Sequence, residues 1–385
     1  MEKELRFPKD FLWGAAVSAY QVEGGINCDW TRFFDAKKAC NHYNLYEKDF
    51  DLMEKLNLNA FRFSIEWSRI EPKEGRFDEK EIEHYRKYLK SLKRRGFCVM
   101  LTLHHFTNPV WFSELGGWES KKAVFYFLRF SKKIFNEYCD LVDFWITINE
   151  PMIYNSLSFF TGRWPPKKKN PISFLRVFRN QISAHKKVYQ IFHKEKESVK
   201  VGISKNNQYF EPYSESFLDR ISVFFARYFW NHLFFKKIKN HLDFIGLNYY
   251  FHNKIQFPFK IRNENKIVSD LGWEVYALGI YYVLGELKKY KLPIFITENG
   301  IADKKDKLRK QFIKEHLIWI LRAIKEGINV KGYFYWSLID NFEWDLGTKP
   351  CFGLIKIDYK SFKRSLRKSG FYYSKISKEN YLAKN

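Results

Sequence analysis

Short apolar runs rich in β-branched and aromatic residues alternate along this chain with longer stretches of helical periodicity. Such alternation is typical of repeated β/α units with parallel strands. No Pro-, Gly- or Ser-rich linker interrupts it, so we predict one (β/α)8 TIM barrel over residues 1–385, of α/β class. The eight predicted strands are Phe11–Ala16, Ala60–Ile65, Val99–His105, Val142–Glu150, Val201–Gln208, Asp243–Tyr250, Pro293–Asn299 and Val330–Leu338.

The segments between these runs place apolar residues three and four positions apart, as expected of helices that cover a sheet with one side. The clearest are Glu79–Arg95, Lys121–Tyr138, Ser173–Glu195 and Lys310–Glu326. In a (β/α)8 barrel the functional groups gather where the strands end and the βα loops begin. We therefore expect the functional site at the C-terminal ends of the predicted strands.

Polar and aromatic side chains stand at most of these strand ends. Buried strands ordinarily end in apolar or turn residues, so this composition indicates a polar pocket. Sugars need such a pocket, because amides and carboxylates bind hydroxyl groups while aromatic faces pack against the C–H side of the ring. The strand-end residues are Arg62, Glu66, His104, His105, Asn149, Glu150, Asn206, Asn207, Asn248, Tyr250, Glu298, Asn299 and Trp336.

The composition, with 45% hydrophobic and 19% aromatic residues, excludes a disordered or fibrous chain. A net charge of +24 raises the question of a polyanionic partner. The basic residues, however, are spread through nearly every predicted helix, and the densest runs, 167–169, 304–307 and 360–368, fall in predicted loops or near the terminal helix. We therefore predict a solvated basic surface and no nucleic-acid partner.

Five cysteines without a CxxC pair indicate neither a disulfide framework nor a zinc ribbon, and they favour a reducing compartment. The apolar run Phe11–Val17 is too short for a membrane span and leads into polar residues. No cluster of His, Cys and carboxylates has ligand spacing, and no Gly-rich phosphate loop occurs. We predict a cytoplasmic protein with no membrane span and no metal or organic cofactor; its oligomeric state stays open.

Two glutamates at the predicted rim have the chemistry of glycoside hydrolysis. Glu150 ends the fourth run in Thr-Ile-Asn-Glu-Pro, and Glu298 ends the seventh in Ile-Thr-Glu-Asn-Gly. Hydrolysis needs one carboxyl group to protonate the leaving oxygen and a second to attack the anomeric carbon or activate water. A single Glu at such a place could simply cap a turn, but two at matching strand ends favour catalysis. Their positions alone do not distinguish inversion from retention.

At this point the sequence resembles glycoside hydrolase family 1, which comprises β-glucosidases, β-galactosidases and 6-phospho-β-glycosidases. The resemblance covers nearly the whole chain and rests on motifs in a fixed order. These motifs lie at 11–25 (FLWGAAVSAYQVEGG), 61–70 (FRFSIEWSRI), 147–151 (TINEP), 246–250 (GLNYY), 296–300 (ITENG) and 335–344 (YWSLIDNFEW).

The resemblance implies that Glu150 is the acid/base and Glu298 the nucleophile, with retention through a covalent glycosyl-enzyme. It further implies that Arg62 and Tyr250 hold the nucleophile and that Asn149 contacts the sugar 2-hydroxyl. The substrate is then a small-molecule or oligosaccharide β-glycoside. The activity would be that of a β-glucosidase, extending to β-galactosides or β-fucosides.

The resemblance also assigns the walls of the sugar pocket. Taken alone, His105 would be interpreted as a buried core histidine and Trp336 as barrel packing, but their place in the motifs reverses that preference. Other residues nearby, namely Glu66, Trp67, His104 and Phe106, are interpreted as structural. The implied sugar-binding residues are Gln21, His105, Asn248, Trp336, Glu343 and Trp344.

Glu343 stands where family members that bind 6-phosphoglycosides usually have a different residue, and a carboxylate there would repel a phosphate dianion. We therefore expect an unphosphorylated glycone. The chain departs from the family pattern at His104–Thr107 and Cys351, and it is shorter by about 50 residues or more, after the first strand and around the fifth and sixth units. This shortening predicts a more open, permissive entrance.

Three alternatives to a hydrolase of unphosphorylated β-glycosides stay open. A transglycosidase would use the same two glutamates and pass the sugar to an acceptor other than water. A 6-phospho-β-glycosidase would require Glu343 to tolerate phosphate. A non-catalytic sugar- or anion-binding protein would use the pocket or the basic surface without chemistry, although both glutamates are intact.

Overall fold

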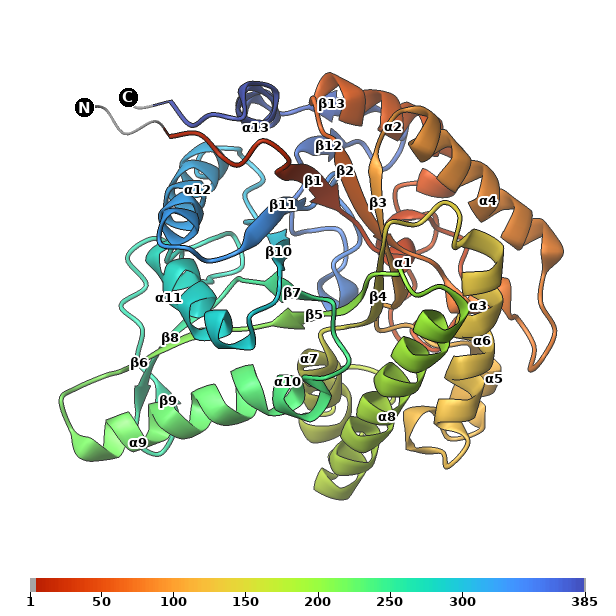
Figure 1. Ribbon diagram of the computed structural model, residues 1–385, viewed down its shortest axis with the longest axis horizontal. Coiled ribbons are helices and arrows are strands. Elements are labelled where there is room, and N and C mark those ends of the chain that lie inside the picture. Colours follow the sequence, from red (N-terminus) through yellow and green to blue (C-terminus); the bar gives the residue numbers. More distant parts are fainter. Residues whose placement is uncertain (1–4, 384–385) are drawn as a thin grey trace.

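The computed structural model describes residues 5–383, and the outermost residues of the predicted domain, 1–4 and 384–385, lie outside this part. Eight parallel strands close into a barrel in the order β1-β11-β10-β7-β5-β4-β3-β2, with β1 also paired to β2 (Figure 1). All eight predicted strands are confirmed, with ends that differ by at most two residues. They are β1 (Leu12–Ala16), β2 (Ala60–Ser64), β3 (Cys98–His104), β4 (Phe144–Asn149), β5 (Val201–Asn206), β7 (Phe244–Asn248), β10 (Ile294–Asn299) and β11 (Val330–Trp336).

Helices cover the outside of the barrel because each turns an apolar side toward the strands. In α4 (Glu79–Arg94), the long helix between β2 and β3, Ile82, Leu89 and Leu92 are buried. Asp78 caps its N-terminus by accepting from the Lys80 and Glu81 amides. The covering helices are α2 (His42–Lys55), α4 (Glu79–Arg94), α6 (Ala123–Tyr138), α8 (Pro171–Glu195), α10 (Leu233–Ile238), α11 (Leu278–Leu287), α12 (Arg309–Lys325) and α13 (Lys368–Glu379).

The core has two parts, one between strands and helices and a smaller one inside the barrel. Inside, glycine on one strand makes room for phenylalanine on another. A Cβ at Gly14 would lie 2.4 Å from the ring of Phe334, and one at Gly202 would lie 2.7 Å from Phe244. The filled barrel interior holds the strand ends rigidly, so the side chains at the rim are held in fixed directions.

The βα loops add structure above the strand ends. The loops after β5 and β7 together form a small sheet of β6 (Tyr209–Pro212), β8 (His252–Gln256) and β9 (Lys260–Ile261), with α9 (Phe217–Ala226) packed on it. The remaining short elements are α1 (Ala19–Val22), α3 (Trp67–Ile70), α5 (Val110–Glu114), α7 (Pro151–Asn155) and the hairpin of β12 (Ile355–Ile357) and β13 (Arg364–Leu366). No helix within residues 5–383 is long and apolar enough to cross a membrane.

Candidate active site

Glu150 follows directly on β4 and begins α7. Its backbone is left-handed, with φ 42°, and Pro151 takes the first helical position, where a missing N–H costs nothing. This turn directs the side chain over the barrel instead of along the strand. The Asn248 side-chain amide donates to Glu150 Oε1 over 2.8 Å.

The environment of Glu150 favours its protonated form. Burial, followed by the negative charge of Glu298, raises the pKa of Glu150 to about 8, against the opposing effects of the Asn248 hydrogen bond and the Arg62 charge. A carboxyl group with this pKa carries a proton at neutral pH. Glu150 can therefore deliver a proton to a leaving group.

Glu298 lies on β10 in the opposite environment. Arg62, fully buried on β2, forms an ion pair with Glu298 Oε1, and the Tyr250 hydroxyl donates to Oε2 over 2.9 Å. Burial and the charge of Glu298 raise the pKa of Tyr250 well above its ordinary value, so the phenol remains a donor. Donors to both oxygens stabilise the carboxylate anion that a nucleophile needs.

A chain of buried polar groups extends from Arg62, the partner of Glu298, along the cavity wall. Arg62 donates to Asn149 Oδ1 over 2.6 Å, and the Asn149 amide donates to His105 Nε2 over 3.0 Å. Burial, followed by the charge of Arg62, lowers the pKa of His105 well below its ordinary value, so the ring is neutral and can accept this hydrogen bond. The network holds Asn149 and His105 in fixed orientations at the cavity wall.

Gln21 and Glu343 form a second polar group on the wall. Gln21 Nε2 donates to Glu343 Oε2 over 3.0 Å and to Asn341 Oδ1 over 3.1 Å, while Ser18 donates to Gln21 Oε1 over 2.7 Å. Burial, followed by the charge of Glu298, raises the pKa of Glu343 to about 8. At neutral pH Glu343 is then a donor as well as an acceptor, as recognition of a hydroxyl group requires.

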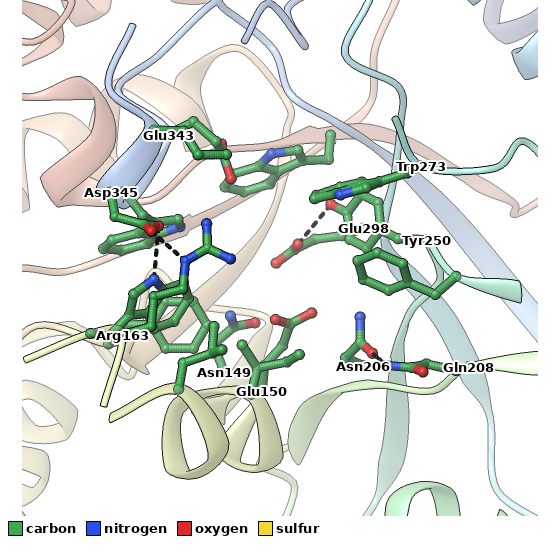
Figure 2. A pocket seen from close by; sticks show the side chains of 18 of the residues that line it. Asn149, Glu150, Arg163, Asn206, Gln208, Tyr250, Trp273, Glu298, Glu343 and Asp345 are labelled. Atoms are coloured by element: carbon green, nitrogen blue, oxygen red, sulfur yellow. Dashed lines mark hydrogen bonds and ion pairs between the residues drawn. The ribbon is translucent and has the colours of Figure 1, made fainter. Parts of the chain in front are cut away.

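These groups surround a cavity of about 400 Å³ at the C-terminal ends of the strands. Figure 2 shows Glu150 and Glu298 pointing into the same space from opposite walls, with Glu343 on a third side. The ring of His105 is nearly parallel to those of Trp336 and Trp344, with centroids 6.0 Å and 5.9 Å away. Polar groups and flat aromatic surfaces thus face one cavity of sugar size.

The structure brings all eleven predicted site residues together. Three of them, Gln21, Arg62 and Asn248, are fully buried and stand behind the wall, hydrogen-bonded to residues that line it. The eight that line the cavity are His105, Asn149, Glu150, Tyr250, Glu298, Trp336, Glu343 and Trp344.

Two of the residues interpreted as structural have the expected role. Glu66 caps α3 by accepting from the Ser68 amide, and His104 accepts from Trp118 Nε1 over 3.2 Å. Phe106 differs, because it lines the cavity while its ring packs against Trp164 and Trp344. Phe106 therefore has the expected packing role and also forms part of the cavity wall.

The arrangement supplies a proton donor, an anionic carboxylate and hydroxyl-binding walls around one cavity. Within residues 5–383, no group of His, Cys, Asp and Glu is placed to hold a metal ion.

The model of glycosyl hydrolase family 1 matches residues 3–238 and 230–382. The chain belongs to glycosyl hydrolase family 1. Beta-glucosidase A of Thermotoga maritima is 32% identical over 440 positions, covering 98% of this chain and 99% of that protein. A galactolipid galactosyltransferase of Arabidopsis thaliana is 33% identical over 86% of this chain and 57% of its own length. The solved beta-glycosidase of Pyrococcus horikoshii superposes with a TM-score of 0.94 at 35% identity, covering 99% of this chain and 97% of that chain.

As a member of family 1, the protein is a glycosyl hydrolase with β-glycosidase activity. The barrel predicted from the sequence is confirmed both by the structure and by its likeness to these neighbours. The alignment with the Thermotoga maritima enzyme spans 440 positions against 385 residues here, so this chain is shorter than that relative; the places of the shortening stay a prediction.

The cavity of this family 1 glycosidase includes residues beyond the predicted set. Asn206 is among the strand-end residues that the sequence places at the rim, although no site role is predicted for it; it ends β5 and accepts from Gln208 Nε2 over 3.3 Å. Asp345 accepts from Arg163 and lies in the 3-10 turn Trp344–Leu346, directly after the predicted residues Glu343 and Trp344, so its neighbours in the sequence could have indicated it. Trp273 packs against Tyr250 from a loop without any periodic pattern, and only the tertiary structure brings this loop to the cavity.

Proposed function

We propose that this protein is a retaining β-glycosidase that hydrolyses unphosphorylated β-D-glucosides, and β-galactosides or β-fucosides with them. We propose further that residues 1–385 act as one catalytic barrel. The observation that carries the proposal is the contrast between two buried glutamates: Glu150 has a pKa raised to about 8, whereas Arg62 and Tyr250 donate to both oxygens of Glu298. Opposite environments divide the roles of acid and nucleophile.

In the first step a carboxylate oxygen of Glu298 attacks the anomeric carbon while the bond to the leaving oxygen breaks. That oxygen takes the proton of Glu150, and a covalent glycosyl-enzyme forms on Glu298. In the second step Glu150 accepts a proton from water, and the water oxygen displaces Glu298 at the anomeric carbon. Two inversions give net retention.

The charge coupling of the two glutamates supports this sequence of proton transfers. The negative charge of Glu298 is one cause of the raised pKa of Glu150. When Glu298 becomes an ester in the glycosyl-enzyme, that charge disappears and the pKa of Glu150 falls. Glu150 then changes from acid to base at the point where the second step needs a base.

The glycone is held by the walls already described. We assign Asn149 to the sugar 2-hydroxyl, Trp336 to the ring face and Trp344 to the ring edge. Of the remaining polar residues, His105 and Glu343 are assigned contacts to hydroxyl groups. Gln21 and Asn248, predicted for the same role, lie behind the wall, and we assign them to holding Glu343 and Glu150 in place.

The charges around the cavity favour a neutral glycone. Glu150, Glu298, Glu343 and Asp345 line it, whereas Arg163 is the only Lys or Arg among the lining residues and is paired with Asp345. At neutral pH Glu150 and Glu343 carry a proton, so they do not repel a phosphate dianion, but the Glu298 carboxylate does and the lining residues offer no free cation to bind it. A 6-phospho-β-glycoside is therefore disfavoured.

The outer part of the cavity, where the leaving group lies, is largely apolar. Leu157, Ile261, Trp273 and Leu346 line it. Such a surface offers contact area without a fixed pattern of hydrogen bonds, so we propose tolerance of alkyl, aryl and oligosaccharide leaving groups. A panel showing activity on one disaccharide alone would contradict this part.

Transfer to an acceptor other than water is a second candidate, because one relative, 33% identical, is described as a galactosyltransferase. The covalent intermediate is the same in both reactions, and the acceptor decides the product. Product analysis in the presence of added alcohol or sugar separates the two. A dominant transfer product at low acceptor concentration would favour the transferase.

The decisive experiment is a p-nitrophenyl glycoside panel, including glucoside, galactoside, fucoside and glucoside 6-phosphate, with wild type, Glu150→Gln and Glu298→Gln. We expect both variants to lose activity, and azide to restore turnover of Glu298→Ala with inverted product. Glu79→Gln, on an exposed helix position, is the matched control. Proton NMR of the first product should show the β-anomer; the α-anomer would refute retention.

The compartment that we propose is the cytoplasm, since all five cysteines are free.

A further inference from the structure

The helix α9 is apolar on two sides. Its inner side packs Val223 against Phe210 and Ile255 of the small sheet. Its outer side carries Phe217, Ile221, Phe224, Phe225 and, one turn on, Tyr228 and Phe229, spaced three and four residues apart along the sequence. Phe217 is 74% exposed, Phe224 64% and Phe229 51%. A surface helix ordinarily turns polar residues outward, so this outer stripe has no partner within the described chain.

The hairpin of β8 and β9 extends the stripe. Phe257, Phe259 and Ile261 are 50%, 54% and 57% exposed. The Phe257 amide donates to Asp219 of α9 over 2.8 Å, so the hairpin tip lies beside the start of the helix. We use the name aromatic face for these exposed apolar residues, which belong to α9, to the turn that follows it and to the hairpin. Contiguous apolar surface of this kind marks an interaction site.

Basic residues accompany the aromatic face. Residues 213–240 and 251–268 contain nine Lys or Arg and three Asp or Glu. Two of the three acidic residues are paired locally: Glu215 pairs with Arg220, and Glu264 pairs with Lys254 and Lys266. Asp219 is buried and accepts hydrogen bonds from Ser214 and the Phe257 amide. An excess of positive charge remains. It comes from Lys236, Lys237 and Lys239, in and directly after α10, and from Lys260 and Arg262 of the hairpin.

We propose that the aromatic face docks on an anionic lipid bilayer surface. Phenylalanine-rich helices with lysine and arginine beside them lie in the interface plane, where the rings enter the acyl boundary and the cations contact lipid phosphates. The stripe is one short helix and a hairpin tip, so it rests on the membrane and does not cross it. A protein partner would require no such cationic border, whereas the anionic headgroups do.

The aromatic face ends at the mouth of the catalytic cavity. Ile261 belongs to the face and also lines the cavity, and α9 lies at the lower edge of the molecule, beside β6, β8 and β9 (Figure 1). Docking would bring the cavity close to the lipid surface. If the proposed glycosidase function holds, amphiphilic glycosides embedded in the bilayer become accessible substrates.

The test uses the full-length protein and sedimenting vesicles of equimolar phosphatidylglycerol and phosphatidylcholine. The variant Phe217→Ser/Phe224→Ser/Phe229→Ser removes the outer stripe. Phe371→Ser is the matched control, because Phe371 is 58% exposed on α13, at the opposite edge of Figure 1. Hydrolysis of soluble p-nitrophenyl β-glucoside checks folding in every variant and stands apart from the docking test.

We expect wild type and Phe371→Ser to sediment with the vesicles, and the triple variant to bind about tenfold or more weakly. Binding should fall in vesicles of phosphatidylcholine alone and on raising NaCl from about 0.1 to about 0.5 M. Failure of wild type to bind, or equal binding by the triple variant, would overturn the proposal. So would a stable wild-type oligomer that the triple variant converts to monomer without any vesicle binding.

Discussion

The charge of Glu298 should determine a large part of the acidity of Glu150, and Glu298→Gln tests this directly. The substitution removes the negative charge and keeps the size of the side chain. Arg62, which lowers the pKa of Glu150, then loses its ion-pair partner and acts on Glu150 unopposed. Both changes favour the ionised form of Glu150, so its pKa must fall.

The magnitude follows from Coulomb's law. Carboxyl groups of retaining glycosidases are about 5.5 Å apart. At an effective dielectric constant of about 20, two unit charges at this separation interact by about 3 kcal/mol, which corresponds to about two pH units. We therefore expect the pKa of Glu150 to fall from about 8 to about 6 in Glu298→Gln. It should remain above the ordinary value of 4.5, because burial is the largest cause of the shift and persists in the variant.

The assay is carbon-13 NMR of protein labelled at the side-chain carboxyl of glutamate, titrated with pH. The signal of Glu150 is identified by its absence from Glu150→Gln. In the wild type, the alkaline limb of kcat/KM should report the same group at a pKa of about 8.

Glu343→Gln is the matched control, since it removes another buried carboxyl group from the same cavity whose charge is not among the main causes of the Glu150 shift. It should change the pKa of Glu150 much less than Glu298→Gln does. A pKa that stays near 8 in Glu298→Gln would refute the coupling and leave burial as the whole cause. The change from acid to base during turnover would then need another explanation.

Three further outcomes are expected. Tyr250→Phe should lower kcat/KM by about tenfold to a hundredfold, because a hydrogen bond to the charged Glu298 is worth about 1.5–3 kcal/mol; unchanged kinetics on aryl glucosides would contradict this. Because the folded pKa of Glu343 is about 8 and its ordinary value is 4.5, the native state binds a proton that the unfolded chain has lost, and stability falls as pH rises between these values. The difference in Tm between Glu343→Gln and wild type should therefore shift in favour of the variant by about 2 °C or more between pH 5 and pH 8. A difference in Tm that does not change with pH would refute this reasoning. Dialysis against EDTA should leave activity unchanged in a standard glucoside assay, and metal-dependent recovery of lost activity would contradict a mechanism with two glutamates alone.

The barrel could be predicted from the sequence because its strands are buried on both faces and appear as continuous apolar runs. The strand-end rule places Glu150, Glu298, Asn149 and Tyr250 at one rim. Pairing Arg62 with Glu298 requires the family resemblance, because the sequence around each residue does not show which side chains of distant strands meet inside a barrel. The structure now gives the contact itself.

The loops were much less predictable. The run Val201–Gln208 was interpreted as one strand, whereas β5 ends at Asn206 and a new strand, β6, begins at Tyr209. Trp273 reaches the cavity from a loop segment whose position depends on packing, and packing has no sequence period. Hydrophobic periodicity also could not show that α9 is apolar on two sides, because a fully buried helix has the same pattern.

The small sheet of β6, β8 and β9 stands outside the closed barrel and is joined to it by the loops after β5 and β7. It carries Gln208, Asn253 and Ile261 to the cavity wall, while the catalytic glutamates remain on β10 and directly after β4. The catalytic residues and the residues that select the leaving group or partner therefore lie on separate structural elements. Exchanging this module between homologues would alter partner and leaving-group preference while the reaction centre is inherited intact, which makes it a natural unit for recombination and for engineering.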